Sequence, residues 1–171
     1  SLSRLLEVVG DTDARVLVVS TGSMRRLGAL ECIEGILGRE RTVFYEPISP
    51  NPSPELVDGV VTVFRREGCV AIVGIGGGSA MDVAKSAAIL QANPHKARDY
   101  LTKEARLERP GATYIAVPTT AGTGSEVTPW ATIWDMEARR KYSLEHRWMF
   151  PSAAIVDPAL MASLSPFQTA V

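Results

Sequence analysis

The chain has 171 residues, of which 46% are hydrophobic and 22% are charged, and its formal net charge is −1. This length and composition fit one soluble globular domain, residues 1–171, with a substantial core. The charge gives no basic surface for nucleic acid, and no apolar run approaches the ~20 residues of a membrane span. We therefore expect neither a nucleic-acid partner nor a membrane.

The two cysteines and two histidines do not form a recognisable metal-ligand pattern. Cys32 and Cys69 both stand among apolar residues, so we interpret them as reduced core residues of a cytoplasmic protein. A disulfide between them remains an alternative. A protein metal site usually takes three or four ligands, so His95 and His146 are interpreted as surface residues. We expect no metal site within this chain.

The first third of the chain alternates between helical and strand patterns. The predicted elements are a helix over Leu2–Val9, a strand over Val16–Ser20, a helix over Met24–Leu37 and a strand over Thr42–Tyr45. A proline-rich loop follows, in which Ser53 can cap and Pro54 can open the next helix. Gly68 ends that helix.

A glycine cluster then separates a strand from a helix. Val70–Ile75 predicts a buried strand, Gly76, Gly77 and Gly78 follow, and Ser79 begins a helical pattern that runs to Leu90. We predict Ser79 as the N-cap, with Asp82 completing a capping-box-like pair.

This strand, glycine turn and helix are the arrangement that binds phosphate. Glycines let backbone N–H groups approach an anion, and a helix start carries unpaired N–H groups and partial positive charge. The spacing is not G-x-G-x-x-G, and it is not a P-loop, because Lys85 lies seven residues past Gly78. A tight turn that needs glycine only for packing remains the alternative.

The second half of the chain begins with a polar segment over 93–111, which we predict as a surface excursion. The elements predicted after it are a strand over Tyr114–Val117, a hairpin of Ala131–Trp134 with Arg140–Leu144, a strand over Ala153–Val156 and a helical turn over Leu160–Leu164. Alternating strands and helices with short links predict an α/β fold. Its parallel sheet is flanked by helices on both faces, with a β-hairpin insertion.

Ligands bind such sheets beyond the carboxyl ends of the strands. The glycine cluster lies at one such end, and Thr21-Gly22-Ser23 lies at another. The segment 118–128, PTTAGTGSEVT, follows a third strand. Its donors to a ribose or a phosphate are the hydroxyls of Thr119, Thr120, Thr123 and Ser125. A merely flexible loop is the alternative for this segment.

Four motifs together resemble the iron-containing, or group III, alcohol dehydrogenases. They are PNPSPE (50–55), GGGSAMDVAK (76–85), PTTAGTGSEVT (118–128) and KYSL with AIVDPAL (141–160). Their order and spacing agree with that family over nearly the whole chain. The stretch PWATIWD with RKYSL is also reminiscent of the subgroup that reduces phosphonoacetaldehyde.

The resemblance implies a two-domain enzyme, of which this chain is the Rossmann-like dinucleotide-binding domain. The other domain would be all-helical and would hold Fe²⁺ or Zn²⁺ through one aspartate and three histidines. We expect that domain to follow Val171 and the family's first strand to precede Leu2. The full-length protein is expected to be a homodimer that acts on a small alcohol or aldehyde.

The resemblance also implies roles for individual residues. Gly76, Gly77, Gly78 and Ser79 would hold the diphosphate of the dinucleotide, with Asp82 near the nicotinamide. The remaining positions would be Thr119, Thr120 and Thr123 on the adenine and ribose side, Ser125, Val127 and Lys141 on the nicotinamide side, and Leu160 against the adenine.

Coenzyme choice depends on the residues after the first strand. NAD-dependent members of that family often carry an aspartate there, which binds a 2′-hydroxyl and repels a 2′-phosphate. Thr21, Gly22 and Ser23 occupy this region here. We therefore predict that NADP(H) is accepted alongside NAD(H), with Ser23 and either Arg25 or Arg26 as partners of the phosphate.

The implied reaction is hydride transfer between nicotinamide and a metal-bound alcohol or aldehyde oxygen. The chain alone, without metal ligands or catalytic residues, is expected to be inactive. Two other functions remain open from the sequence. One is an isolated nucleotide-binding module, and the other is a relative of dehydroquinate synthase or glycerol dehydrogenase.

Overall fold

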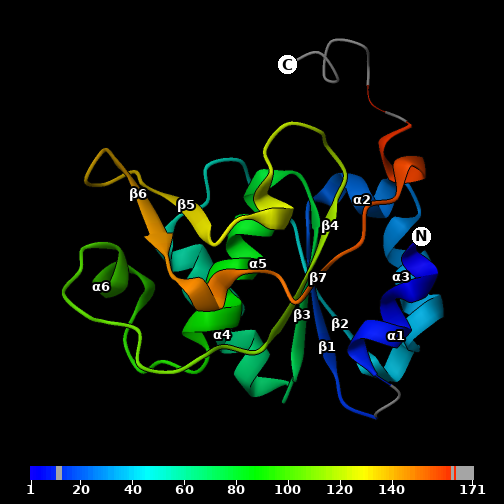
Figure 1. Ribbon diagram of the computed structural model, residues 1–171, viewed down its shortest axis with the longest axis horizontal. Helices are drawn as coiled ribbons and strands as arrows, with labels where there is room; N and C mark the ends of the chain where they lie inside the picture. Colours follow the sequence, from blue (N-terminus) through cyan, green and yellow to red (C-terminus); the bar gives the residue numbers. More distant parts are fainter. Residues whose placement is uncertain (11–12, 163, 165–171) are drawn as a thin grey trace.

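A five-stranded parallel sheet forms the centre of the protein, as seen in a computed structural model that describes residues 1–10, 13–162 and 164. The strand order is β2-β1-β3-β4-β7 (Figure 1). The strands are β1 (Val16–Ser20), β2 (Thr42–Tyr45), β3 (Ala71–Gly76), β4 (Thr113–Pro118) and β7 (Ala153–Ala154). The predicted α/β class with a parallel sheet is confirmed.

Helices cover both faces of this sheet (Figure 1). One face carries α4 (Pro54–Arg66), α5 (Gly78–Leu90) and α6 (Ala97–Leu101), and the other carries α1 (Leu5–Val9), α2 (Gly22–Arg26) and α3 (Ala29–Leu37). Short 3₁₀ turns are η1 (Leu2–Arg4), η2 (Arg39–Arg41), η3 (Ser125–Val127), η4 (Arg147–Met149) and η5 (Pro158–Met161). Because both faces are covered, β1 and β3 are buried along their whole length, which explains their unbroken apolar runs.

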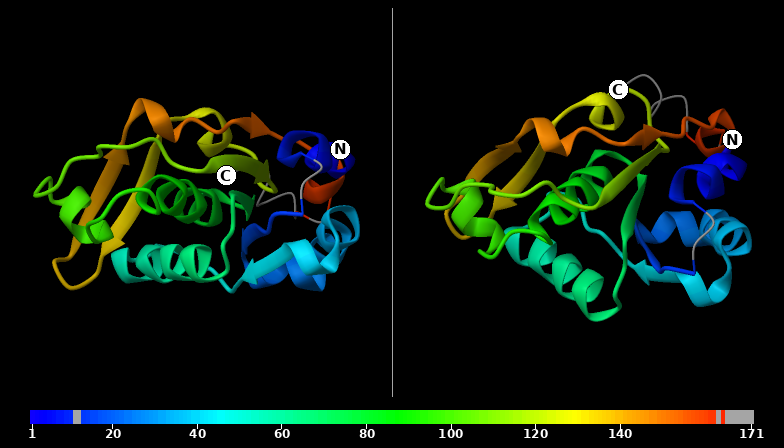
Figure 2. Two further views of the ribbon diagram at one scale, coloured as in Figure 1. Left: turned by 90° about the horizontal axis from the view of Figure 1, so that it is seen from below. Right: turned by 60° about the horizontal axis from the view of Figure 1, so that its bottom comes forward.

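An antiparallel hairpin packs beside α5 (Figure 2). It consists of β5 (Trp130–Asp135) and β6 (Arg140–Glu145), as predicted. Ala131, Ile133 and Leu144 contribute to the same hydrophobic cluster as α4 and α5. The hairpin therefore forms an extra layer outside α5, and it brings polar residues of β5 and β6 near the start of that helix.

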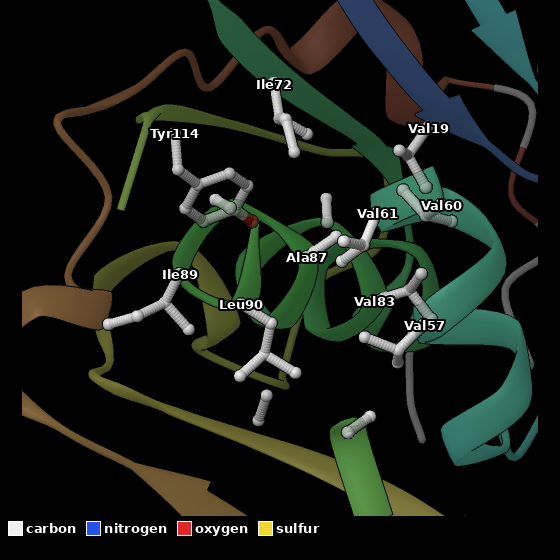
Figure 3. Close-up of a cluster of buried hydrophobic side chains, with 14 of the residues drawn as sticks. Val19, Val57, Val60, Val61, Ile72, Val83, Ala87, Ile89, Leu90 and Tyr114 are labelled. Atoms are coloured by element: carbon white, nitrogen blue, oxygen red, sulfur yellow. The ribbon is translucent and has the colours of Figure 1, made fainter. Parts of the chain in front are cut away.

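The hydrophobic core is divided by the sheet into two clusters. On one face Val60 of α4, Val83 of α5 and Ile72 of β3 belong to one cluster, in which Val83 lies beside Val57 of α4 (Figure 3). On the other face Val73 of β3 packs with Ile33 of α3. Ile72 and Val73 face opposite clusters because successive side chains of a strand point to opposite faces.

The predicted helix over Met24–Leu37 is wrong in one respect, because it is interrupted. α2 ends at Arg26, α3 begins at Ala29, and Gly28 lies between them with φ at +74°. Glycine adopts this left-handed conformation at little cost. Met24 before the break and Leu30 and Ile33 after it are all buried, so their spacing gave no sign of it, whereas Leu27 at the break is 53% exposed.

The predicted surface excursion over 93–111 is only partly exposed. The buried amide of Asn93 donates to the carbonyls of Ile89 and Arg109 and accepts from the backbone N–H of Glu108. A Cβ at Gly111 would lie 2.1 Å from the carbonyl oxygen of Ala88. This segment therefore passes directly against the end of α5 and is tied to it.

Near the carboxyl end of the chain, the last elements are shorter than predicted. Only Ala153 and Ala154 form a strand, although the N–H of Ile155 still donates to Ala116. The predicted helical turn over Leu160–Leu164 is the 3₁₀ turn η5, which ends at Met161, and residue 163 lies outside the described residues.

The two cysteines have different environments and are both free thiols. Cys69 is buried, as predicted, whereas Cys32 is exposed on the outer side of α3, so its prediction as a core residue is wrong. Apolar neighbours in the sequence of a helix do not all share its buried side.

Among the helices in the described ranges, none is both long and apolar enough to cross a membrane.

Candidate functional site

The carboxyl ends of β1, β3 and β4 meet at one edge of the sheet. Thr21 follows β1, Gly77 follows β3, and the segment 119–128 follows β4. The N–H of Thr119 donates to the carbonyl of Gly76 at 3.0 Å, which joins the start of this segment to the end of β3. The glycine turn and the threonine-rich segment therefore lie side by side, as the sequence predicted.

The start of α5 depends on glycine. Gly76 has φ at +146°, and a Cβ there would lie 3.0 Å from the Cβ of Ala80 and 3.5 Å from Cγ2 of Thr21. The prediction of Ser79 as N-cap is wrong, because the N-cap is Gly77 and no described side chain caps this helix. Consequently, the N–H groups of the first turn keep the partial positive charge of an open helix start.

The threonines of the segment 119–128 close over this helix start. A Cβ at Gly77 would lie 3.3 Å from Oγ1 of Thr120, and a Cβ at Gly78 would lie 3.2 Å from Cγ2 of Thr123. The two threonine side chains thus pack closely against the glycine turn, where any other residue would bring in a side chain. Backbone amides of an uncapped helix start with hydroxyl groups beside them are suited to binding a phosphate or diphosphate.

A pocket of about 260 Å³ opens beside this helix start. Its lining residues are Pro52, Gly78, Ser79, Asp82, Thr123, Ser125, Thr128, Trp130, Thr132, Trp134 and Lys141. Six of them, from Gly78 to Lys141 along the chain, are residues that the resemblance singled out. The structure therefore gathers the predicted residues of α5, the threonine-rich segment and β6 in one place.

The remaining predicted residues lie around this pocket or away from it. The hydroxyls of Thr21 and Ser23 are 2.9 Å apart at the end of β1, and Thr119 is buried. Val127 is 63% exposed and lines none of the described pockets. Leu160 lies in a separate apolar pocket beside α2 and α3, among Met24, Leu27, Ala29 and Ala159.

Asp82 connects α5 to the far side of the pocket. Its carboxylate accepts hydrogen bonds from Oγ of Ser125 at 2.7 Å and from the N–H of Thr132 at 2.9 Å. This corrects the predicted capping role, because the carboxylate points across the pocket. Burial raises the pKa of Asp82, although these hydrogen bonds and Lys85 oppose that rise.

Several residues of the site were not predicted. Trp134 supplies an aromatic face over which Nζ of Lys141 lies 5.6 Å from the ring centroid. Lys85 is buried behind the pocket and holds the segment that carries Ser125. Its one signal in the sequence is a lysine within the apolar run AMDVAKSAAIL, three residues after Asp82 and so on the same helical side.

No group of three or more histidine, cysteine, aspartate or glutamate side chains that could hold a metal ion occurs among the described residues. The described residues therefore do not supply the ligands for the iron or zinc ion that the resemblance implies. The site in this chain offers amides, hydroxyls, one carboxylate and one exposed lysine, which are groups that bind and orient a nucleotide.

A profile of iron-containing alcohol dehydrogenases matches residues 1–158. The chain belongs to that family. The family match confirms the resemblance carried by the four motifs, and it agrees with the fold.

Similar proteins include enzymes of this family with different named substrates. The chain is 33% identical over 156 residues to the long-chain primary alcohol dehydrogenase of Thermoanaerobacter ethanolicus, covering 90% of the chain and 39% of that protein. It is 35% identical over 170 residues to the phosphonoacetaldehyde reductase of Streptomyces viridochromogenes, covering 88% and 43%.

A solved relative has the same fold. The sulfoacetaldehyde reductase of Bifidobacterium kashiwanohense, solved with NAD⁺, superposes with a TM-score of 0.89 at 31% identity, covering 98% of this chain and 44% of that one. The chain therefore spans about two fifths of the length of these iron-containing alcohol dehydrogenases.

Proposed function

We propose that residues 1–171 form the dinucleotide-binding domain of an alcohol dehydrogenase or aldehyde reductase that uses NAD(H) or NADP(H). The observation that carries this proposal is the uncapped start of α5, where the glycine turn lies against Thr120 and Thr123 and borders the pocket that Gly78 and Ser79 line. A nicotinamide dinucleotide supplies a diphosphate for this helix start and hydride chemistry at its nicotinamide ring.

The arrangement of the pocket supports distinct roles for its residues. In this proposal the amides of Gly77, Gly78 and Ser79 bind the diphosphate. Asp82, Ser125 and Lys141 line the adjoining pocket, which would take the nicotinamide and its ribose. Leu160 lies in the apolar pocket beside α2, which would take the adenine. In this scheme Thr119, Thr120 and Thr123 border the nearer ribose, and Val127 stays at the outer rim.

The chain's own residues would bind and orient the coenzyme. Trp130 and Trp134 would exclude water from one wall of the pocket, and Lys141 would donate to a ribose hydroxyl. Because the described residues do not fit a metal ion, we place the family's Fe²⁺ or Zn²⁺ on residues outside this chain.

The proposed substrates are small alcohols and aldehydes. Two of the similar proteins are named for aldehydes that carry an acidic group, phosphonoacetaldehyde and sulfoacetaldehyde, and a third is named for long-chain primary alcohols. From this range we infer that the substrate is chosen by residues beyond the coenzyme site, and phosphonoacetaldehyde is one candidate.

The residues after β1 support acceptance of a 2′-phosphate. No aspartate follows this strand. Ser23 lies just beyond the end of β1, and its half-buried hydroxyl could donate a hydrogen bond to a 2′-phosphate. Arg25 is engaged by Glu46 and Glu31, whereas Arg26 has no ion-pair partner among the described residues. Arg26, rather than Arg25, is therefore the proposed cation for the phosphate of NADPH.

The test is to titrate the full-length protein with NADPH and with NADH and to compare the two dissociation constants. We expect NADPH to bind at least as tightly as NADH, and Arg26→Met to weaken NADPH alone. NADH binding that is tighter by about tenfold or more, a difference of about 1.4 kcal/mol, would contradict the NADP(H) proposal.

Turnover then separates an enzyme from an isolated binding module. With Fe²⁺ or Zn²⁺ added, we expect the full-length protein to oxidise NADPH or NADH in the presence of a small aldehyde. Binding without turnover of any tested aldehyde or alcohol would favour a module that only binds nucleotides. Failure to bind either dinucleotide would refute the proposed function.

A further inference from the structure

Lys85 is a buried cation that the coenzyme site does not directly use. Only 1% of its surface is exposed, and it lies on α5 behind the pocket. Its Nζ donates to the backbone carbonyls of Ser125 at 2.8 Å, Thr128 at 2.8 Å and Trp130 at 2.9 Å. A single ammonium group thus binds three carbonyls of one short segment, one for each of its three N–H donors.

Asp82 holds the same segment from one turn earlier on α5. Its carboxylate accepts from Oγ of Ser125 and from the N–H of Thr132. Asp82 and Lys85 are three residues apart and therefore lie on the same side of the helix. The carboxylate of Asp82 and the ammonium group of Lys85 therefore both hold residues 125–132 against α5.

The fixed segment continues directly into the residues that close over the helix start. Thr123 lies against Gly78, and Ser125 donates its backbone N–H to Oγ1 of Thr123 at 3.4 Å. A shift of residues 125–130 would therefore move Thr123 relative to the amides of α5. Lys85 itself lines none of the described pockets, so its effect on a ligand must pass through this segment.

We infer that Lys85 is a positioning residue for the coenzyme: its ammonium group holds the segment 123–130 against α5 at the distance that dinucleotide binding requires. The inference rests on the proposed function, because it assumes that the start of α5 at Gly77 and Gly78 binds a diphosphate. In this inference Lys85 makes no contact with the coenzyme. It influences the affinity for the coenzyme by holding three main-chain carbonyls of the segment.

Loss of a proton from Lys85 would weaken this hold. A neutral amine has two N–H donors and a lone pair, so one of the three buried carbonyls would lose its partner. Burial lowers the pKa of Lys85 to about 8, against the opposing effects of Asp82 and Glu126. Coenzyme affinity should therefore fall as the pH rises through about 8.

Other ionisable groups around this network come from every element packed against it. Asp82 lies on α5, Glu126 on η3, Lys141 on β6 and Tyr114 on β4. Burial raises the pKa of Tyr114 well above its ordinary value, so its hydroxyl stays protonated across this range. A Lys85→Met variant keeps all four groups, and it therefore isolates the contribution of Lys85.

The experiment measures the dissociation constant of NADH or NADPH for the full-length protein from about pH 6.5 to about pH 9.5, a range that brackets the pKa of Lys85. The variants are Lys85→Met and, as a matched control, Lys103→Met, whose exposed side chain lies outside the coenzyme pocket. For the unmodified protein and the control, we expect affinity to fall by about fivefold or more above pH 8. For Lys85→Met we expect binding about tenfold weaker at neutral pH and no step near pH 8.

The outcomes separate this inference from the proposed function. If the unmodified protein binds neither dinucleotide at any pH, the proposed function is refuted, and Lys85 then has no coenzyme whose binding it could affect. If it binds but its affinity does not fall anywhere between about pH 6.5 and about pH 9.5, the inference is overturned, even where Lys85→Met does not fold. Equal affinity and equal pH dependence in the unmodified protein and a folded Lys85→Met variant would overturn it as well.

Discussion

At Gly78, the absence of a side chain keeps the start of α5 open. A Cβ there would stand 3.2 Å from Cγ2 of Thr123, at the helix start where we propose that the diphosphate binds. Gly78→Val should weaken dinucleotide binding by about tenfold or more, because its side chain would displace Thr123 and cover the amides of the first turn. Fluorescence titration with NADH measures the effect, and thermal unfolding verifies that the variant folds.

Gly35→Ala is the matched control for that substitution. Gly35 lies within α3, and nothing stands within 4 Å of the position of its Cβ. Alanine in a helix interior is more favourable than glycine by about 0.5–1 kcal/mol, so this variant should be slightly more stable and bind the dinucleotide normally. If Gly78→Val also bound normally, the diphosphate could not lie at this helix start.

The two thiols should differ in reactivity. Cys32 is exposed on α3, whereas burial raises the pKa of the Cys69 thiol to about 11. The thiolate is the reactive form, so the folded protein should present one fast thiol at about pH 8 to an aromatic disulfide reagent. Because its pKa is raised in the fold, Cys69 favours folding below pH 9 and loses that contribution as the pH approaches 11.

Counting the released thiol groups measures this difference. One equivalent should react quickly in the folded chain, and the second should react only as the chain unfolds in urea. A Cys32→Ser variant should abolish the fast phase. A fast phase that persists in this variant would show that Cys69 is accessible, against its burial in the core.

At the scale of elements, Arg98 of α6 ties the hairpin to the helical layer. Its guanidinium binds the carboxylate of Asp135, which is only 2% exposed at the end of β5, and it also donates to Glu55 at 3.1 Å. Arg98→Met would leave the buried carboxylate with the N–H of Ala138 as its remaining donor among the described residues. We expect a lower urea midpoint, because an unpaired buried carboxylate is unfavourable.

A second substitution tests the cause of that loss. In Arg98→Met with Asp135→Asn, the carboxylate charge is gone, so the double variant should recover part of the lost stability. Arg106→Met removes an exposed arginine that has no ion-pair partner among the described residues, and its midpoint should stay unchanged. No recovery in the double variant would mean that Arg98 acts through packing instead.

The elements themselves were largely predictable, and their ends were not. Apolar runs such as Val16–Ser20 predicted the strands because a covered parallel sheet buries both sides of each strand. The N-cap of α5 was misplaced at Ser79 because local sequence favours a hydroxyl there, whereas the side chain of Asp82 is drawn across the pocket by Ser125 and Thr132. Tertiary contacts decided that helix end, and one sequence carries no direct record of them.

The candidate site could be predicted only in part, because the sequence shows which residues end the strands and does not show main-chain contacts. Glycines and threonines at the carboxyl ends of strands were identified from topology, since those ends share one edge of a parallel sheet. Lys85 was missed because its partners are main-chain carbonyls 40 to 45 residues away in sequence. Such contacts leave no pattern of side chains for a sequence analysis to detect.

At the scale of the whole molecule, the sheet separates two hydrophobic clusters. Both clusters include side chains of the same strands, so we expect them to unfold together. Ile72 belongs to the cluster beneath α4 and α5, and Ile33 belongs to the cluster beneath α3. Ile72→Val and Ile33→Val should each cost about 0.5–1.5 kcal/mol of unfolding free energy. Because the two side chains share no cluster, the double variant should lose the sum to within about 0.5 kcal/mol.

Urea denaturation followed by both fluorescence and circular dichroism measures these free energies. A single transition should be seen by both probes in all variants, since each cluster is bounded by the same five strands. Two separate transitions, or a double variant that departs clearly from the sum, would show that the two halves of the core do not melt together. Dinucleotide binding should be unchanged in both single variants.

Because Lys85 and its neighbours hold the rim of the site mainly by backbone oxygens, the identity of several rim side chains is not tied to the position of the rim. Val127 in particular is 63% exposed, and its side chain is not among those that Lys85 or Asp82 contacts. Evolution, or a designed library, could therefore vary this position widely and alter what the mouth of the pocket admits. The anchoring lysine and aspartate beneath would keep the shape of the mouth constant throughout such a search.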